Sequence, residues 1–189
     1  MTNLHVVLIH YPVVNKNGEV IASAVTNLDL HDISRAAKTF GVRSFYVVTP
    51  LDDQRVFVDR IVGYWVKGAG AKYNPMRDEA LKLISIKASL DEVVDEICAD
   101  CGTRPEVVVT SARPRDRGLS YSDFHQMLKS GRPYLLALGT AWGLSEDFIA
   151  EADHILDPIV GDTDYNHLSV RSAAAIMLDR LMGCRTGTA

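Results

Sequence analysis

The sequence has few cysteines and no long apolar run. Its three cysteines are too few, and odd in number, to form a framework of disulfides. Cys98 and Cys101 make an isolated Cys-x-x-Cys pair at the end of an expected helix, without the second ligand pair that a zinc site needs. We interpret them as half-buried thiols and expect no metal. Because no apolar run approaches the ~20 residues of a membrane-spanning helix, we also expect no membrane segment.

Positive charge is not in excess either. Lys and Arg number 20 against 24 Asp and Glu, a net charge of −4. This balance excludes a protein coated in positive charge for nucleic acid but allows local basic patches. The N-terminal run MTNLHVVLIHYPVV lacks the basic segment and cleavage site of a secretory signal, so we expect a cytoplasmic protein. A length of 189 residues, 47% of them hydrophobic, favours one domain with a substantial core.

Apolar runs and helical periodicities alternate along the chain. This alternation predicts an α/β fold with a mainly parallel sheet flanked by helices. The expected strands are residues 4–9, 44–49, 83–87, 106–110 and a run from Tyr134, and the expected helices are residues 29–40, 52–66, 90–99, 121–129 and 170–182. Between them we expect a turn at Asn17-Gly18, a glycine-rich loop at residues 67–73 and a short helix opened by Asn74-Pro75.

The stretch from residue 134 to 181 is the most informative part. It combines a strand, a turn with Gly139 and Gly143, a short helix, a strand, a turn with Gly161 and a nearly all-apolar helix. Glycines let the backbone approach a flat ligand, and ligands of open α/β sheets bind where strands end. The same pattern also fits two ordinary strand-to-helix turns.

Three runs are similar to motifs of the SpoU–TrmD (SPOUT) RNA methyltransferases, in that family's order. NLDLHDISRAAKTFGV, from Asn27, resembles Asn-x-Gly-x-x-x-Arg-x-Ala-x-x-Phe-Gly-Val. Residues 138–144 resemble Gly-x-Glu-x-x-Gly-Leu, and HLSVRSAAAIMLDR, from His167, resembles Ser-Leu-Asn-x-Ser-x-Ala-Ala-Ala-Ile. The chain resembles in particular a branch of small SAM-dependent RNA methyltransferases, found free or attached to tRNA guanine methyltransferases.

The resemblance implies a fold that the strand pattern alone does not. It implies that residues 1–189 form a single α/β-knot domain, with a deep trefoil knot in the C-terminal, SAM-binding part from about 107 to 185. It also implies a homodimer that methylates tRNA or rRNA. The apolar helix at residues 170–182 agrees, because it must be covered on more than one side, either by a second subunit or by elements of its own chain.

For the cofactor, S-adenosyl-L-methionine, the resemblance points to backbone atoms of three turns, at residues 110–112, 139–144 and 159–168. The expected cofactor-binding residues are Thr110, Ser111, Gly139, Thr140, Gly143, Leu144, Ile159, Gly161, Leu168 and Ser169.

The departures from the motifs concern the reacting groups. Asp29 stands where the first motif has Asn, His31 where it has Gly, and Ser169 where the last has Asn. The middle turn is one residue short and lacks the Glu. A SAM-binding module without catalysis, acting in regulation or interaction, is therefore an alternative. A flavodoxin-like nucleotide-binding protein is a third, which the loop after Ile9 disfavours because it lacks a Ser/Thr/Gly-rich anion site.

Arg35 is the first candidate for catalysis, since it matches the arginine of the first motif. It lies opposite the apolar face of its helix and forms a basic stripe with His31 and Lys38, a pattern that also fits a solvated helix face. Asp29 and Asp32 are candidates for a general base, or simply favour the helix N-terminus. Two further basic segments are a loop at residues 113–118 and the glycine-rich loop, either an RNA-contacting lid or a surface loop. The expected RNA-binding residues are His31, Lys38, Arg113, Arg115, Arg117, Lys67 and Lys72.

Overall fold

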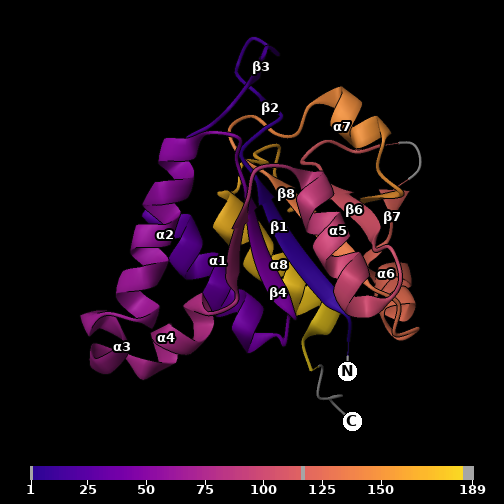
Figure 1. The fold of residues 1–189 in the computed structure, drawn as a ribbon. Helices are drawn as coiled ribbons and strands as arrows, with labels where there is room; N and C mark the ends of the chain where they lie inside the picture. Colours follow the sequence, from indigo (N-terminus) through magenta and orange to yellow (C-terminus); the bar gives the residue numbers. More distant parts are fainter. Residues whose placement is uncertain (1, 116–117, 185–189) are drawn as a thin grey trace.

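A seven-stranded parallel sheet forms the centre of the protein (Figure 1). The structure, a computed structural model, describes residues 2–115 and 118–184. The strand order is β5-β4-β1-β8-β6-β9-β7, and every pair in this sheet is parallel. The strands are β1 (Leu4–Ile9), β4 (Ser44–Val48), β5 (Ile84–Lys87), β6 (Glu106–Thr110), β7 (Gly118–Leu119), β8 (Tyr134–Gly139) and β9 (His154–Leu156). The strands β2 (Val13–Val14) and β3 (Val20–Ile21) pair separately as an antiparallel hairpin.

Helices cover both faces of the sheet. The first face carries α1 (Asn27–Thr39), α2 (Asp52–Val66), α4 (Pro75–Leu81), α6 (Tyr121–Leu128) and α8 (Val170–Met182), and the second carries α5 (Leu90–Cys101) and α7 (Glu146–Ala150). Strand β1 shows why: Val6 and Leu8 lie in one core, Val7 and Ile9 in the other, all fully buried. The continuous apolar run therefore predicted correctly a strand that is buried on both faces.

Local capping sets several helix boundaries close to those predicted. Thr26 caps α1, which begins two residues before the expected start, and its side chain accepts a hydrogen bond from the backbone N–H of Asp29. Asn74 caps α4 with Pro75 at the first helical position, as predicted. The predicted bounds of α2, β6 and α8 are confirmed. The two-residue strand β7 and the hairpin around Gly18 give too short a pattern to be read as strands from sequence.

The glycine-rich segment is not a loop, and the prediction was wrong there. Residues Ala69–Tyr73 form the short helix α3, and the buried Gly70 packs on Trp65 so closely that a Cβ would lie 2.6 Å from the indole Cε3. This glycine serves packing rather than mobility. Helix α3 also lies at the end of the molecule opposite to α7 and the β2–β3 hairpin, so it cannot act as a lid over the strand ends of its own chain (Figure 1).

Helix α8 is covered mostly by its own chain. It packs against α1, α6 and β8, and its buried residues are Ala174, Met177, Leu178 and Leu181. Ala175 and Ile176 stay half-buried. The nearly all-apolar composition of α8 is therefore explained largely by these internal contacts. Of the residues described, no helix has both the length and the apolar character needed to cross a membrane.

Candidate active site

The structure brings the three predicted turns together at the carboxyl ends of β6, β8 and β9. Since β6 pairs with both β8 and β9, the turns that follow these strands lie side by side. Asn166 Nδ2 of the third turn donates a hydrogen bond to the carbonyl of Ala112 in the first, at 2.9 Å. The rings of Trp142, in the middle turn, and His167, in the third, lie 6.4 Å apart between centroids.

The middle turn has a tightly constrained backbone. Ala141 and Gly143 have positive φ angles of +52° and +110°, a region that glycine adopts without cost. A Cβ on Gly139 would lie 2.8 Å from the backbone nitrogen of Leu144, so only glycine fits there. Hydrogen bonds in both directions join the turn to β2, from Trp142 N–H to the Val14 carbonyl at 3.0 Å and from Val14 N–H to the Gly143 carbonyl at 2.9 Å.

The side chains of the expected cofactor residues are mostly engaged in local bonds. Thr110 Oγ1 donates to the Ala137 carbonyl, Ser111 Oγ accepts from the Arg113 N–H, and Ser169 Oγ caps α8. These side chains are therefore engaged within the chain, and the backbone groups of the turns stay the predicted contacts of the cofactor. Leu144 is a core residue, 4% exposed, whereas Leu168 is 44% exposed and Gly161 has nothing within 4 Å of its Cβ position.

A buried polar chain that sequence reasoning missed supports the middle turn. His10 Nδ1 and Ser23 Oγ are 2.9 Å apart, Ser23 Oγ contacts Thr140 Oγ1, and Thr140 Oγ1 donates to the Ile9 carbonyl. If Thr140 gives its hydroxyl proton to Ile9, Ser23 must donate to Thr140 and accept from His10 Nδ1–H. Burial lowers the pKa of His10 to about 4, so its ring is neutral at pH 7.

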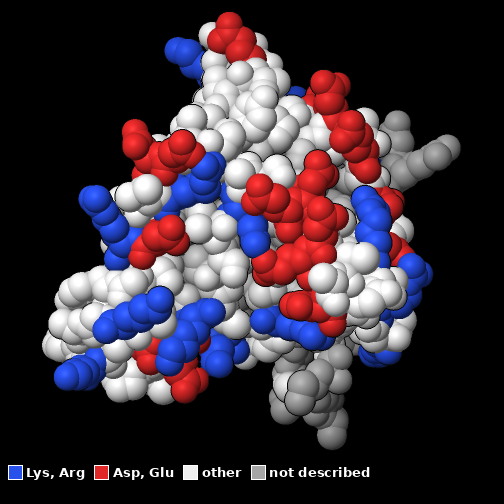
Figure 2. Space-filling view, in the orientation of Figure 1, with Lys and Arg blue, Asp and Glu red and all other residues white. Residues whose placement is uncertain are grey.

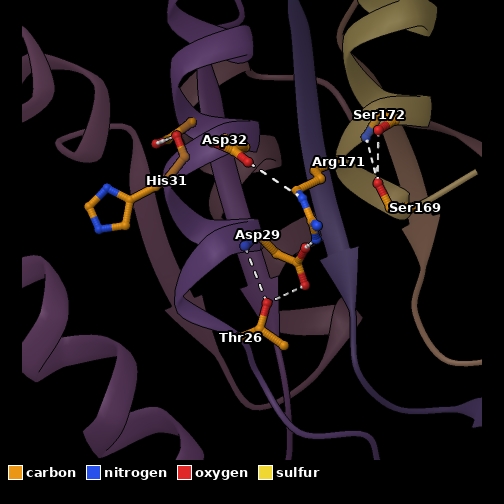
Figure 3. Close-up of polar contacts among 8 residues, drawn as sticks. Thr26, Asp29, His31, Asp32, Ser169, Arg171 and Ser172 are labelled. Atoms are coloured by element: carbon orange, nitrogen blue, oxygen red, sulfur yellow. Dashed lines mark hydrogen bonds and ion pairs between the residues drawn. The ribbon is translucent and has the colours of Figure 1, made fainter.

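A second missed residue, Arg171, joins the first and last motifs (Figure 3). Its Nη1 donates to Asp29 Oδ1 at 3.2 Å, and its Nε lies 3.5 Å from Asp32 Oδ2. The other oxygen of Asp29 accepts from Thr26 Oγ1 at 2.7 Å, and Asp29 is 6% exposed. One arginine at the start of α8 thus holds two of the three expected catalytic residues, Asp29 and Asp32. In the last motif, the position of Arg171 carries the Ser of Asn-x-Ser.

The expected basic stripe on α1 is not a continuous surface. Arg35 is exposed, but Lys38 pairs with Glu79 of α4 at 3.5 Å, and the His31 ring packs edge-on against Trp65. Burial, helped by the nearby positive charge of Arg77, lowers the pKa of His31. Arg35 therefore remains available to an incoming ligand, whereas the other two are engaged within the chain.

The other predicted RNA-binding residues are scattered. Arg115 makes a bidentate ion pair with Glu146 of α7, with both N–O distances 2.8 Å, which raises the pKa of the arginine and lowers that of the carboxyl. Arg113 is exposed, and Arg117 lies outside the described residues. The exposed Lys67, at the end of α2, and Lys72, in α3, belong to the end of the molecule that lies away from α7 (Figure 1). Figure 2 shows positive side chains gathered around α3 and α4, and negative ones over α5 and α7.

Neither of two surface hollows, each of about 630 Å³, is lined by residues of these turns. One lies under α7 and is lined by residues such as Arg115, Ile149 and His154, and the other lies near Tyr121 and Arg180. Within the described parts of the chain, no three His, Cys, Asp or Glu side chains are grouped as metal ligands. The convergence of the turns, rather than cavity shape, identifies the candidate site.

The fold is shared with SpoU methyltransferases. The structure of the SpoU methyltransferase AviRb from Streptomyces viridochromogenes, in complex with AdoMet, superposes with a TM-score of 0.55 over 96% of this chain and 58% of that chain, at 19% identity. This similarity establishes the architecture of the sheet and its helices.

The sequence comparisons identify the family. Residues 3–183 match the family model described as SAM-dependent RNA methyltransferase, and the chain belongs to this family. An uncharacterized protein of Aquifex aeolicus is 41% identical over 95% of this chain and 88% of its own length. A tRNA (guanine-N(1)-)-methyltransferase of Oleidesulfovibrio alaskensis is 44% identical over 96% of this chain, which spans only 42% of that longer protein.

The residues of the three turns fit SAM, the cofactor of this family. The third turn has exposed apolar side chains, Val160 and Leu168, that suit an adenine, and open space around Gly161. The exposed carboxylates of Asp162 and Asp164 in the same turn suit the positive sulfonium. When bound, SAM supplies an electrophilic methyl group on a positively charged sulfur.

Proposed function

We propose that this chain binds SAM across the turns at residues 110–112, 139–144 and 159–168 and catalyses methyl transfer to tRNA or rRNA. The observation that supports the proposal most is the convergence of these turns, joined by the bond from Asn166 to the Ala112 carbonyl, in a chain of the SAM-dependent RNA methyltransferase family. Such an enzyme is expected in the cytoplasm, with its RNA.

The contacts around Arg171 support a different role for each polar residue near it. Both carboxylate oxygens of Asp29 are engaged and the residue is buried, so Asp29 positions Arg171. Asp32 has a side chain that is 46% exposed, so it is the better candidate to accept the proton that the target atom loses. Arg171, 35% exposed, keeps guanidinium donors for a phosphate or the target, and Arg35 supplies a second positive charge.

The RNA named for the longer relative makes tRNA the first substrate to test. Because this chain matches only 42% of that protein, the named guanine methylation belongs to the whole protein and not necessarily to the matching part. The target base and atom of this chain are therefore open to experiment.

The overall organisation is also part of the proposal. We expect residues 1–189 to form one domain, with a trefoil knot in the part from about 107 to 185. Strand β9 lies on the side of β6 away from β8, yet the chain after β9 returns and places α8 beside α1 and β8. This return of the chain supports the expected knot. We also expect a homodimer, supported by the half-buried apolar residues that α8 keeps outside its internal contacts.

Titration calorimetry with SAM and S-adenosylhomocysteine tests the cofactor proposal. Gly161→Val should abolish binding without lowering the melting temperature, because the new side chain enters open space rather than the core. Gly63→Val is the matched control, since nothing lies within 4 Å of a Cβ at Gly63 either, on α2. Absence of heat with both ligands, alongside tight binding of a flavin or ADP, would refute the proposal.

A non-catalytic SAM-binding module is the second candidate. The ion pair of Asp29 with Arg171 favours it, because both residues replace neutral ones of the SPOUT motifs. Single-turnover transfer from radiolabelled SAM to RNA of a deletion strain separates the two. Binding of SAM without transfer to any RNA fraction would favour the module.

A further inference from the structure

Three aromatic rings stand exposed at the edge of the cofactor turns. Trp142 of the middle turn is 65% exposed and Tyr165 of the third turn 75% exposed, and His167 is exposed between them. The centroid of the His167 ring lies 6.4 Å from that of Trp142 and 6.3 Å from that of Tyr165. The rings come from two turns that follow different strands, so only the fold assembles them.

The backbone holds Trp142 in this exposed position. The residues before and after it have positive φ angles, and its own N–H donates to the Val14 carbonyl at 3.0 Å. A turn constrained in this way keeps the indole out of the core. An exposed indole leaves favourable apolar burial unused, which is typical of a surface that a ligand or partner covers.

The surroundings of the rings suit a nucleic acid. Asn166, between Tyr165 and His167, fastens the third turn to Ala112, and the exposed Arg113 follows Ala112 directly. Flat exposed rings match a nucleobase, because unpaired bases stack on aromatic side chains, and an arginine on the neighbouring turn can contact the RNA backbone. The exposed Asp162 and Asp164 of the third turn add negative charge nearby, so the rings rather than the local charge carry the argument.

We infer that Trp142, Tyr165 and His167 form a stacking platform for an unpaired nucleobase of the RNA substrate. The methylated nucleotide, or its immediate neighbour, is thus recognised outside a duplex, at the edge of the cofactor turns. This inference rests on the proposed function, because it assigns the platform to the RNA of that reaction. A base inside a helix hides its faces, so a duplex cannot use the platform.

The experiment compares Trp142→Ala, Trp142→Phe and Tyr165→Ala with the wild type. Fluorescence anisotropy measures binding of a labelled unpaired oligoribonucleotide and of a hairpin with the same composition, and calorimetry measures SAM affinity. Because stacking contributes about 1–3 kcal/mol per base, Trp142→Ala should weaken binding of the unpaired RNA roughly 5- to 150-fold. Trp142→Phe should restore most of it, and SAM affinity should stay within about twofold of the wild type. Tyr73→Ala is the matched control, since Tyr73 is 85% exposed on the distant α3.

The possible results separate the platform from the cofactor site, from a subunit contact and from the proposed activity. Unchanged RNA affinity in Trp142→Ala excludes stacking on this ring. A parallel loss of SAM affinity makes the rings part of the cofactor site, and a change from dimer to monomer in light scattering makes them a subunit contact. A wild type that stacks RNA through Trp142 but transfers no methyl group would contradict the proposed activity and leave the platform intact. A Trp142→Ala variant that transfers methyl groups as well as the wild type would contradict the platform alone.

Discussion

Asp29 and Arg171 are 142 positions apart in sequence, yet their side chains meet at 3.2 Å. In the SPOUT motifs these positions carry Asn and Ser, so two departures that look unrelated in sequence are neighbours in space. Arg171 is partly exposed and can be solvated by water, but a carboxylate as deeply buried as that of Asp29 needs a positive partner. The pair therefore has to be changed together.

A double-mutant cycle tests this dependence. Arg171→Ser should destabilise the fold by roughly 1–2 kcal/mol, below the usual cost of breaking a buried pair because Arg171 is partly exposed. Asp29→Asn in the same chain should recover part of the loss, since the uncompensated charge is removed. Urea denaturation gives the four free energies of unfolding. Strict additivity of the two changes would show that the pair is not coupled.

Arg35 is tested at the same scale. Since it is exposed on α1, Arg35→Ala should leave the melting temperature and SAM affinity near the wild type. Loss of a charge-stabilising group should reduce single-turnover methyl transfer by about 10²-fold or more. Arg60→Ala, an exposed arginine on α2, is the control. Full transfer by Arg35→Ala would show that Arg35 is only a solvated helix residue.

At the scale of the element, α8 shows how an apolar helix is covered. Its composition alone allowed either a partner subunit or its own chain as the cover, and β8, α1 and α6 bury most of it. What remains for a second protomer is the half-buried part that contains Ala175 and Ile176. The dimer prediction therefore depends on a smaller surface than the sequence implied.

Ile176→Asp addresses that surface directly. We expect a dimer for the wild type in light scattering at micromolar concentration, and a monomer with near-normal circular dichroism for Ile176→Asp. A charge at this half-buried position keeps contact with water in the single chain, and its cost becomes large when a partner covers it. Met177→Asp is the contrasting variant, since Met177 is 5% exposed and should unfold the chain instead. A monomeric wild type would contradict the prediction.

At the scale of the whole molecule, two buried histidines make stability depend on pH. Burial lowers the pKa of both His5 and His10 to about 4. The unfolded chain binds protons from about pH 6.5 downward, whereas the folded chain resists them until about pH 4. The free energy of unfolding should therefore fall as the pH drops from 6.5 to 4, by up to roughly 3 kcal/mol for each histidine.

Urea denaturation at pH 7 and pH 5 measures this slope. His10→Asn should reduce the pH dependence, although it also lowers stability at pH 7 by breaking the contact with Ser23. His125→Asn controls for the loss of a histidine as such. An unchanged slope in His10→Asn would show that His10 is not the titrating group.

Most helices and strands, and the family, could be predicted from local patterns in the sequence. Strand β1, the capped helices and the three motifs are local patterns of burial and backbone preference, and such patterns need no knowledge of distant residues. The convergence of the three candidate cofactor turns followed from them, because parallel strands end at one edge of the sheet.

Which side chains meet at these turns depends on how distant segments fold together. The contact of Ser23 with Thr140 spans 117 positions, and that of Asp29 with Arg171 spans 142. Neither leaves a local pattern, since each residue alone fits an ordinary loop or helix end. Helix α3 differs, because the contact of Gly70 with Trp65 is only five positions apart, and there the glycines themselves had indicated a loop. Packing between distant segments settles such choices, because it outweighs the small local preferences of single residues.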